Sequence, residues 1–230
     1  MVDMHSHFLP AIDDGAKNIT EAAEMLRYAK DNGTDIIVAT PHIRPYCEED
    51  ISEGIKKRNE AFSLLCNGGT DGFPEIRLGF EVYLGAEITQ HQNFADMCIL
   101  DTNLMLLEMP FKVWDDFAVE RVTLVRDAGI TPILAHIERY IGFRGNKEKA
   151  LSLDGVIYQV TAEAFLHFGT RRFIEKLIKS GKKVVVGSDM HDPTVRKSKM
   201  REAFEKEKNK GEAFKGVQRR GCLIIKTGCK

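Results

Sequence analysis

The sequence predicts a single-domain α/β protein, a distorted (β/α)7 TIM-like barrel. Short apolar segments rich in β-branched residues recur about seven times along the 230 residues, and segments with helical spacing separate most of them. The chain is 43% hydrophobic, which is enough for one packed core at this length. Strands that alternate with helices form parallel sheets, and seven units are too few for a regular eight-stranded barrel. An open doubly wound sheet is the alternative.

The predicted strands are short runs dominated by Val, Ile and Leu. In chain order they cover residues 2–5, 35–40, 76–83, 103–108, 131–136, 156–160 and 183–187. The carboxyl ends of the strands of a parallel barrel meet at one rim. Functional side chains are therefore expected where these segments end.

The predicted helices lie between these strands and cover residues 20–32, 48–65, 116–128 and 170–180. Apolar residues recur in them at helical spacing. Gly33, Gly129 and Gly181 directly follow three of the four, and a glycine after the last helical residue is a common stop signal.

Composition limits the partners of this chain. Lysine and arginine total 33, aspartate and glutamate total 34, and the net charge is −1. This balance gives no global basic field, so we expect neither nucleic-acid binding nor direct membrane insertion. No apolar run approaches the roughly 20 residues of a membrane span, and the N-terminus lacks a signal-peptide pattern. The five cysteines, at 47, 66, 98, 222 and 229, form no CxxC pair, which predicts reduced thiols and a cytoplasmic protein.

Nine residues with metal-binding side chains lie at or near the ends of the predicted strands or in the first loop. Five are among the seven histidines and four are carboxylates: His5, His7, Asp14, His42, Glu81, Glu108, His136, Asp189 and His191. Carboxylates crowded into a partly buried rim would repel one another. Divalent cations neutralise that charge and accept nitrogen and oxygen ligands together. Nine ligands suit two or three ions better than one.

The spacing of His5 and His7 supports a shared ion. Residues i and i+2 of a strand point to the same side, so both imidazoles can bind one cation. Asp189 and His191 repeat this spacing. A lone histidine at a strand end is more often an ordinary polar residue, but this explanation weakens when five strand ends share the feature.

The acidic residues near these motifs are assigned different roles. Asp14 is interpreted as a ligand, with capping of a turn as the alternative, whereas Asp13 is expected to stabilise the turn around Gly15. Glu87 and Glu138 are expected to be peripheral, although Glu138 is adjacent to the site.

These segments resemble the PHP (polymerase and histidinol phosphatase) superfamily. The matching motifs are "DMHSHFLPAIDDGA", "ATPHIRP", "GFEVY", "LLEMP", "AHIERY" and "VGSDMHD". Within the superfamily they are most similar to the manganese-dependent protein-tyrosine phosphatases that regulate bacterial capsule and exopolysaccharide synthesis. The similarity runs from Val2 to about Glu207, and Ala11 stands where that family usually has glycine.

The resemblance implies a trinuclear centre with the nine residues as ligands. It also implies that Arg139 in "HIERY" and Arg196 in "DPTVR" bind phosphate. His42 and His136 are assigned to the catalytic set as well as to the ligands. Manganese is the expected metal, in two or three ions, with iron, zinc, cobalt and magnesium as alternatives.

The resemblance further implies a substrate and a domain organisation. The expected substrate is the phosphotyrosine-containing tail of a membrane-associated tyrosine kinase, and homo-oligomerisation is left open. The metallophosphatase barrel is expected over residues 1–207. Residues 208–230 are predicted to be an atypical tail, packed on the barrel or trailing from it, because they lack the apolar closing helix expected for the family.

The expected chemistry is hydrolysis of a phosphate monoester. Clustered cations would lower the pKa of a bound water, and the resulting hydroxide would attack phosphorus in line with the leaving phenolate. The metals and the two arginines would stabilise the phosphoryl oxygens, and a site histidine or a metal-bound water would protonate the leaving group. The sequence disfavours a cysteine phosphatase, because no cysteine is followed six positions later by arginine.

Three other functions remain open at this stage. The first is a small-molecule phosphatase, such as one acting on histidinol phosphate. The second is a non-catalytic regulator with structural metals. The third is a metallonuclease, which the balanced charge disfavours.

Overall fold

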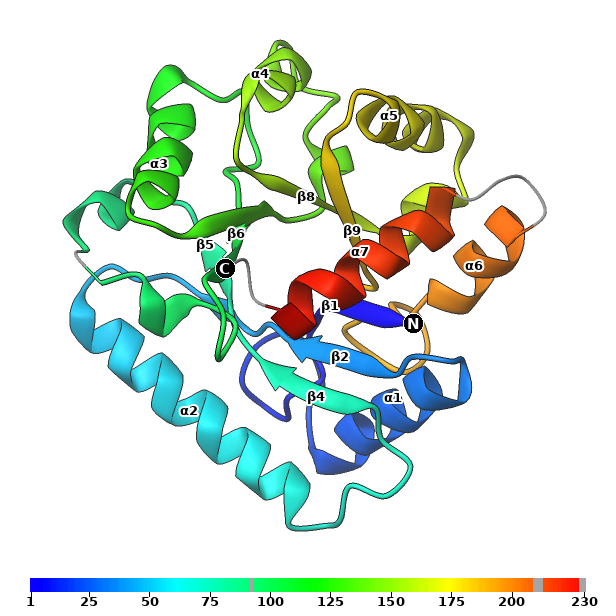
Figure 1. Cartoon of the computed structure of the whole chain (residues 1–230). Helices are drawn as coiled ribbons and strands as arrows, with labels where there is room; N and C mark the ends of the chain where they lie inside the picture. The colour runs from blue at the N-terminus through cyan, green and yellow to red at the C-terminus, as the bar shows by residue number, and fades with distance from the viewer. Residues whose placement is uncertain (92, 209–212, 228–230) are drawn as a thin grey trace.

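The computed structural model describes residues 1–91, 93–208 and 213–227. The strands of this part of the chain are β1 (Val2–Ser6), β2 (Ile36–Ala39), β3 (His42–Ile43), β4 (Glu75–Leu78), β5 (Glu81–Tyr83), β6 (Leu104–Glu108), β7 (Thr131–Leu134), β8 (Ile157–Thr161) and β9 (Lys183–Gly187). They pair in parallel in two sheets, in the orders β1-β2-β4 and β3-β5-β6-β7-β8-β9. Helices surround them in a ring (Figure 1).

Two of the predicted strands are each divided in two. The segment 35–40 continues past Pro41 as β2 and β3, and the segment 76–83 is interrupted at Gly79 as β4 and β5. Proline lacks the N–H that a ladder needs, which explains the first break. The two interrupted strands, β2 with β3 and β4 with β5, nevertheless stay side by side. Gly79 N donates to Ala39 O (2.8 Å), and Glu81 N donates to Pro41 O (3.0 Å). When β2 with β3 and β4 with β5 are each counted as one interrupted strand, seven strands build the barrel. The predicted fold class is confirmed.

The barrel closes where β9 meets β1. Asp189 N donates to His5 O (2.8 Å), and His7 N donates to Met190 O (2.9 Å). The buried carboxylate of Asp3 adds a third link by accepting a hydrogen bond from Ser188 N (2.7 Å). Gly187 permits this close approach, since a Cβ there would lie 2.4 Å from the Cβ of His5.

The helices are α1 (Ile19–Asp31), α2 (Glu48–Cys66), α3 (Asp116–Asp127), α4 (Asn146–Ser152), α5 (Phe168–Lys179), α6 (Met200–Lys208) and α7 (Ala213–Thr227). The four predicted helices correspond to α1, α2, α3 and α5, and α4 was not predicted. Short 3-10 turns are η1 (Ala86–Gln90), η2 (Ala95–Met97), η3 (Ile137–Arg139) and η4 (Ala162–Phe165). The Asn18 side chain caps α1 by accepting from Glu21 N (3.0 Å), and Asp115 caps α3 in the same way.

Apolar side chains fill the barrel and the layer around it. Met4, Val38, Leu106, Ile133 and Val185 belong to one buried cluster contributed by separate strand lines. A second buried cluster joins α1 and α2 to the outside of β2 and β4, and the largest joins α3, α4 and α5 to the remaining strands. The strands are thus buried on both faces, as parallel strands usually are.

Helix α7 closes the barrel at the amino ends of the strands (Figure 1). Gln218 Oε1 accepts from Val2 N (2.6 Å), Val217 is fully buried, and Ile225 packs into the cluster that fills the barrel. The expectation that no apolar closing helix follows residue 207 is therefore wrong. The apolar face of α7 has Val217, Gly221 and Ile225 one turn apart, with Cys222 and Ile224 packed beside Ile225, and the basic composition of the segment conceals it.

Four of the five cysteines lie in the described part of the chain. Cys47, Cys66, Cys98 and Cys222 are unpaired, and Cys229 lies outside the described residues. Among the described helices, none has the length and apolarity needed to cross a bilayer.

Candidate metal centre

The nine predicted ligands meet at the rim formed by the carboxyl ends of the strands. β1 and the turn after it carry two of them, β3, β5 and β6 carry one each, and the segments that follow β1, β7 and β9 carry the rest. Pairing in register places His42 beside Glu81, and Tyr83 beside Glu108. The barrel thus brings together residues up to 186 positions apart in the chain, from His5 to His191.

Glu81 lies at the centre of this rim and is 1% exposed. Its Oε2 lies 3.1 Å from His5 Nε2, 3.3 Å from His7 Nε2 and 3.1 Å from His42 Nδ1. Its other oxygen lies 2.8 Å from His136 Nε2. One carboxylate therefore faces four imidazoles.

Two aspartates extend the site on either side of Glu81. Asp189 Oδ1 lies 3.4 Å from His5 Nε2 and 3.5 Å from His7 Nε2. Asp14 Oδ1 lies 3.4 Å from both His42 Nε2 and His191 Nε2. Asp14 is 59% exposed at its side chain, so the outer edge of the site opens to solvent.

Hydrogen bonds outside the cluster fix which imidazole nitrogens carry lone pairs. Gln159 Oε1 accepts from the backbone N of His136 (2.6 Å), which identifies it as oxygen, so His5 Nδ1 at 3.1 Å must carry the proton. Asp13 accepts from His7 Nδ1 (2.7 Å) in the same way. In the neutral rings, the two Nε2 atoms are then unprotonated. They lie 3.0 Å apart, and both face Glu81.

His191 repeats this arrangement on the outer side. Its Nδ1 lies 2.9 Å from the carbonyl oxygen of Asp189 and is therefore the protonated nitrogen. Its Nε2 lone pair then points toward Asp14. Histidines that ligate metals almost always donate their other N–H to a carboxylate, carbonyl or amide oxygen, which is the pattern seen at three rings here.

The donor set fits divalent cations. Lone pairs that converge on a buried carboxylate repel one another, and Glu81 Oε2 is a buried oxygen without a hydrogen-bond partner. Ligand atoms about 2.0–2.2 Å from one ion lie about 3–3.5 Å from each other, as the nitrogen–oxygen pairs do here. Three overlapping groups could hold an ion: His7, Asp14, His42 and His191; His5, His7 and Glu81; and His42, Glu81 and Glu108.

The imidazoles and carboxylates of the cluster shift one another's pKa values, and the carboxylates raise the pKa values of His5 and His7 in spite of their burial. Burial opposes the ionisation of Glu81, but the surrounding imidazoles outweigh it and hold its pKa well below the ordinary value. The pKa of Asp189 is likewise well below its usual range, where His5 and His7 outweigh burial. Burial and the neighbouring His7 lower the pKa of His191 to about 4, which keeps this ring neutral. Burial and the charge of Glu81 raise the pKa of Glu108.

Two site residues have left-handed backbone conformations. His136 has φ of 30° and Asp189 has φ of 52°. Such angles are costly for residues other than glycine and cluster at functional sites. The prediction that β7 runs to His136 is wrong for this reason, because the strand ends at Leu134 and His136 turns the chain into η3.

Two arginines reach the rim close to Asp189. Arg139, at the end of η3, forms a short ion pair with Asp189 Oδ2. Arg196 Nη1 lies 3.2 Å from Asp14 Oδ2, and its Nη2 lies 3.9 Å from Asp189 Oδ2. A small cavity lined by both arginines, Asp189 and Ser188 opens beside the cluster.

Two residues that were not predicted as part of the site, Asp13 and Gln159, hold its histidines in place. Asp13 does stabilise the turn at Gly15, whose N–H it binds at 2.9 Å, but its other oxygen also holds His7 Nδ1 and the backbone N–H of His42. Gln159 was not predicted at all, although a buried amide in the middle of the apolar strand "VIYQV" is a signal that could have identified it.

The remaining polar candidates lie outside the cluster. Glu138 is buried and accepts hydrogen bonds from Thr161 N and Oγ1, so it links η3 to β8. His91 is held by Glu48 and the carbonyl of Pro45, and His167 is exposed.

The fold and this rim define the class: a parallel barrel with a site for several divalent cations at the carboxyl ends of its strands. Residues 1–216 match the family model of capsular polysaccharide synthesis proteins, CpsB/CapC. The chain belongs to this family, and the resemblance seen in its motifs is confirmed.

Relatives with known names support this placement. The chain is 29% identical over 240 aligned residues to the putative tyrosine-protein phosphatase CapC of Staphylococcus aureus, covering 98% of this chain and 91% of the relative. It is 28% identical over 219 residues to the tyrosine-protein phosphatase YwqE of Bacillus subtilis strain 168, covering 89% and 82%.

Solved structures share the fold. One, from work on YwqE of Bacillus subtilis and CpsB of Streptococcus pneumoniae as metal-dependent tyrosine phosphatases, superposes with a TM-score of 0.77 at 24% identity over 99% of this chain and 95% of the other. Histidinol phosphate phosphatase of Lactococcus lactis, with zinc, histidinol and phosphate, gives a TM-score of 0.55 at 15% identity over 94% and 93%.

Proposed function

We propose that this chain hydrolyses phosphotyrosine on a protein substrate at the rim centred on Glu81. It is a metal-dependent tyrosine-protein phosphatase tied to capsular polysaccharide synthesis. The observation that carries the assignment is the convergence of imidazole lone pairs on a buried, unpartnered carboxylate oxygen. Cations bound there would lower the pKa of a water molecule and supply hydroxide near neutral pH.

The nine residues of the rim are proposed as ligands of two or three ions. Manganese is the proposed metal because of the resemblance to manganese-dependent phosphatases, and the imidazole and carboxylate groups of the clusters, with no thiolate among the described residues there, can accept it. Iron, zinc, cobalt and magnesium accept overlapping donor sets and are the alternatives.

Arg139 and Arg196 are proposed to bind the phosphoryl oxygens. Each guanidinium presents N–H groups in a plane that matches two oxygens of a phosphate. Both line the small cavity beside the metal cluster. Their contacts with Asp189 and Asp14 hold them at its edge until a phosphate competes for the same N–H groups.

The proton for the leaving phenolate comes from a site histidine or from water. Of the two histidines in the catalytic set, the side chain of His42 is 36% exposed and that of His136 is 5% exposed, so His42 is the one that a large substrate can contact. Since both are also proposed as ligands, a metal-bound water is the alternative proton donor. Phenol has a pKa of about 10, so its anion leaves more readily than an alkoxide.

We assign catalysis to the barrel over residues 1–207 and treat residues 208–230 as an atypical C-terminal tail packed on it. The described part of this tail, α7, lies at the other end of the barrel from the ligands. The proposed substrate is the phosphotyrosine-containing tail of a membrane-associated tyrosine kinase, reached from the cytoplasm.

The test is hydrolysis of a phosphotyrosine peptide before and after metal removal. Chelation followed by desalting is expected to abolish turnover, and added Mn²⁺ is expected to restore it. Histidinol phosphate serves as the comparison substrate under the same conditions. Turnover that survives chelation would contradict the metal-dependent scheme, and a strong preference for histidinol phosphate would contradict the protein substrate.

A further inference from the structure

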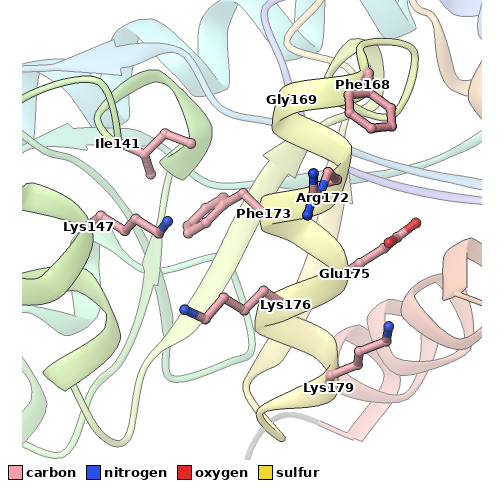
Figure 2. A pocket seen from close by; sticks show the side chains of 9 residues that line it. All are labelled: Ile141, Lys147, Phe168, Gly169, Arg172, Phe173, Glu175, Lys176 and Lys179. Carbon is pink, nitrogen blue, oxygen red and sulfur yellow. The ribbon is translucent and has the colours of Figure 1, made fainter.

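A groove of about 710 Å³ lies between α4 and α5, separate from the metal cluster. Figure 2 shows Lys147 on α4 and Lys176 on α5 pointing into it from opposite sides, with the ring of Phe173 beside them. Phe173 is 5% exposed and forms an apolar floor. Arg172 and Lys179 extend the basic side chains along the outer surface of α5.

These four cations are available to a ligand. Within the described chain, none of Lys147, Arg172, Lys176 and Lys179 takes part in an ion pair, whereas most other lysines near helices α3 to α5 are held by a neighbouring carboxylate or carbonyl. The one acidic residue among the described lining residues is Glu175. Its carboxylate is already bound by Arg171 Nη2 at 3.1 Å.

The spacing of the charges suits an extended chain of acidic residues. Positions 172, 176 and 179 follow one side of α5 at intervals of four and three residues. At 1.5 Å per helical residue they span about 10 Å, which is the length of about three residues of extended peptide. Phe168, 75% exposed at the upper end of the groove, adds an aromatic contact beside Arg172.

A short stretch of chain connects the groove to the metal cluster. Ile141 lines the groove and lies two residues after Arg139, which reaches the cluster. The intervening Tyr140 is buried, with its ring 5.5 Å from that of His136. The groove therefore begins beside the loop that carries the proposed phosphate-binding arginine.

We propose that this groove docks an acidic segment of the phosphoprotein substrate, next to the phosphotyrosine that enters the metal cluster. The entry of phosphotyrosine into the metal cluster rests on the proposed phosphatase function, whereas the binding of an acidic segment in the groove does not. A concave site with cations on both walls fits a peptide better than a flat anionic membrane, which favours cations that project from the surface.

The test compares two phosphotyrosine peptides, one with Asp and Glu flanking residues and one with Asn and Gln in their place. The groove variant is Arg172→Glu/Lys176→Glu. Its matched control is Lys30→Glu/Lys56→Glu, which reverses two exposed cations on α1 and α2. A small aryl phosphate, which cannot reach the groove, measures the chemistry alone.

The wild-type chain is expected to prefer the acidic peptide by roughly tenfold in kcat/KM at low salt. The groove variant should lose this preference and keep its turnover of the aryl phosphate, while the control keeps both. A preference that survives in the groove variant, or that the control loses equally, would overturn the proposal.

Direct binding separates this proposal from the phosphatase function. Fluorescence anisotropy of a labelled acidic peptide with unmodified tyrosine is expected to show binding that the groove variant loses, even if no phosphotyrosine peptide is hydrolysed. Absence of such binding overturns the docking site. Vesicles containing 30% phosphatidylserine that bind the chain through the groove, when the peptide does not, would assign the surface to a membrane instead.

Discussion

The two ends of this barrel are built from the same strands and have opposite properties. The carboxyl ends carry five imidazoles and four carboxylates, with two residues in left-handed conformations. The amino ends are closed by α7, whose Ile225 enters the apolar filling of the barrel. Polar groups crowded at one end cost free energy unless they are neutralised, whereas apolar burial at the other end stabilises the fold. The comparison shows that the two functions are separated along the barrel axis. The carboxyl ends of the strands carry the chemistry, and the apolar interior closed by α7 at the amino ends stabilises the fold.

The largest expected effect comes from removing the charge at the centre of the rim. Glu81→Gln keeps the shape but loses the anion that faces four imidazoles, so bound metal per chain should fall, and turnover should drop by about 10³-fold or more. Elemental analysis and phosphotyrosine hydrolysis measure the two effects. The control is Glu60→Gln on the exposed surface of α2. Full metal occupancy in the Glu81 variant would show that the centre lies elsewhere.

Arg139→Ala should weaken transition-state binding while the metals stay in place. Loss of one preorganised charge stabiliser costs about 2–4 kcal/mol, or roughly 10²–10³-fold in kcat/KM. Metal analysis beside steady-state kinetics distinguishes this outcome from damage to the cluster. If metal is lost as well, then the contact of Arg139 with Asp189 acts on the ligands rather than on phosphate.

Gly187→Ala tests the seam where β9 meets β1 and closes the barrel. The new Cβ would lie 2.4 Å from His5 Cβ and 2.9 Å from His5 N, so β9 must move away from β1. We expect a loss of about 3 kcal/mol in the free energy of unfolding, measured by urea denaturation. Gly142→Ala, where the added Cβ meets no atom within 4 Å, should be close to neutral. Equal stability of the two variants would refute a tight seam.

Ile225→Ala should affect stability without affecting chemistry. Truncation of this side chain, 5% exposed, leaves a cavity at the closed end and should cost about 2 kcal/mol in the free energy of unfolding. The kcat for a small aryl phosphate should not change at a temperature where both proteins are folded. A parallel fall in kcat would show that the two ends are coupled through the strands.

Local patterns made much of the fold predictable. Glycines after three of the helices, and the alternation of apolar runs with helical ones, predicted the order of elements and the (β/α)7 barrel. The short helix α4 was not foreseen, and two strands were predicted as continuous. The break at Gly79 has no local signal as strong as Pro41, because it depends on how the neighbouring line bends.

The C-terminal helix shows why composition can mislead. Its segment is rich in Lys, Arg and Gly, so it was expected to lack an apolar closing helix. A few apolar side chains among the basic ones, Val217, Cys222, Ile224 and Ile225, are enough when the partner surface is already an apolar barrel mouth. The number of apolar side chains that α7 needs depends on the barrel surface that it covers, and this surface cannot be seen in the sequence of the segment.

By itself, the sequence determined which residue types stand at the strand ends. Each apolar strand segment and the histidine or carboxylate that follows it are neighbours in the chain, so the pattern can be read without the fold. It thereby determined the family and the candidate ligands. Only the tertiary structure decided that Asp13 and Gln159 hold the tautomers of His7 and His5, and that basic side chains of α4 and α5 face one groove. These hydrogen bonds and the groove bring together side chains from separate segments of the chain. Their distances and orientations are set only when the strands close into a barrel.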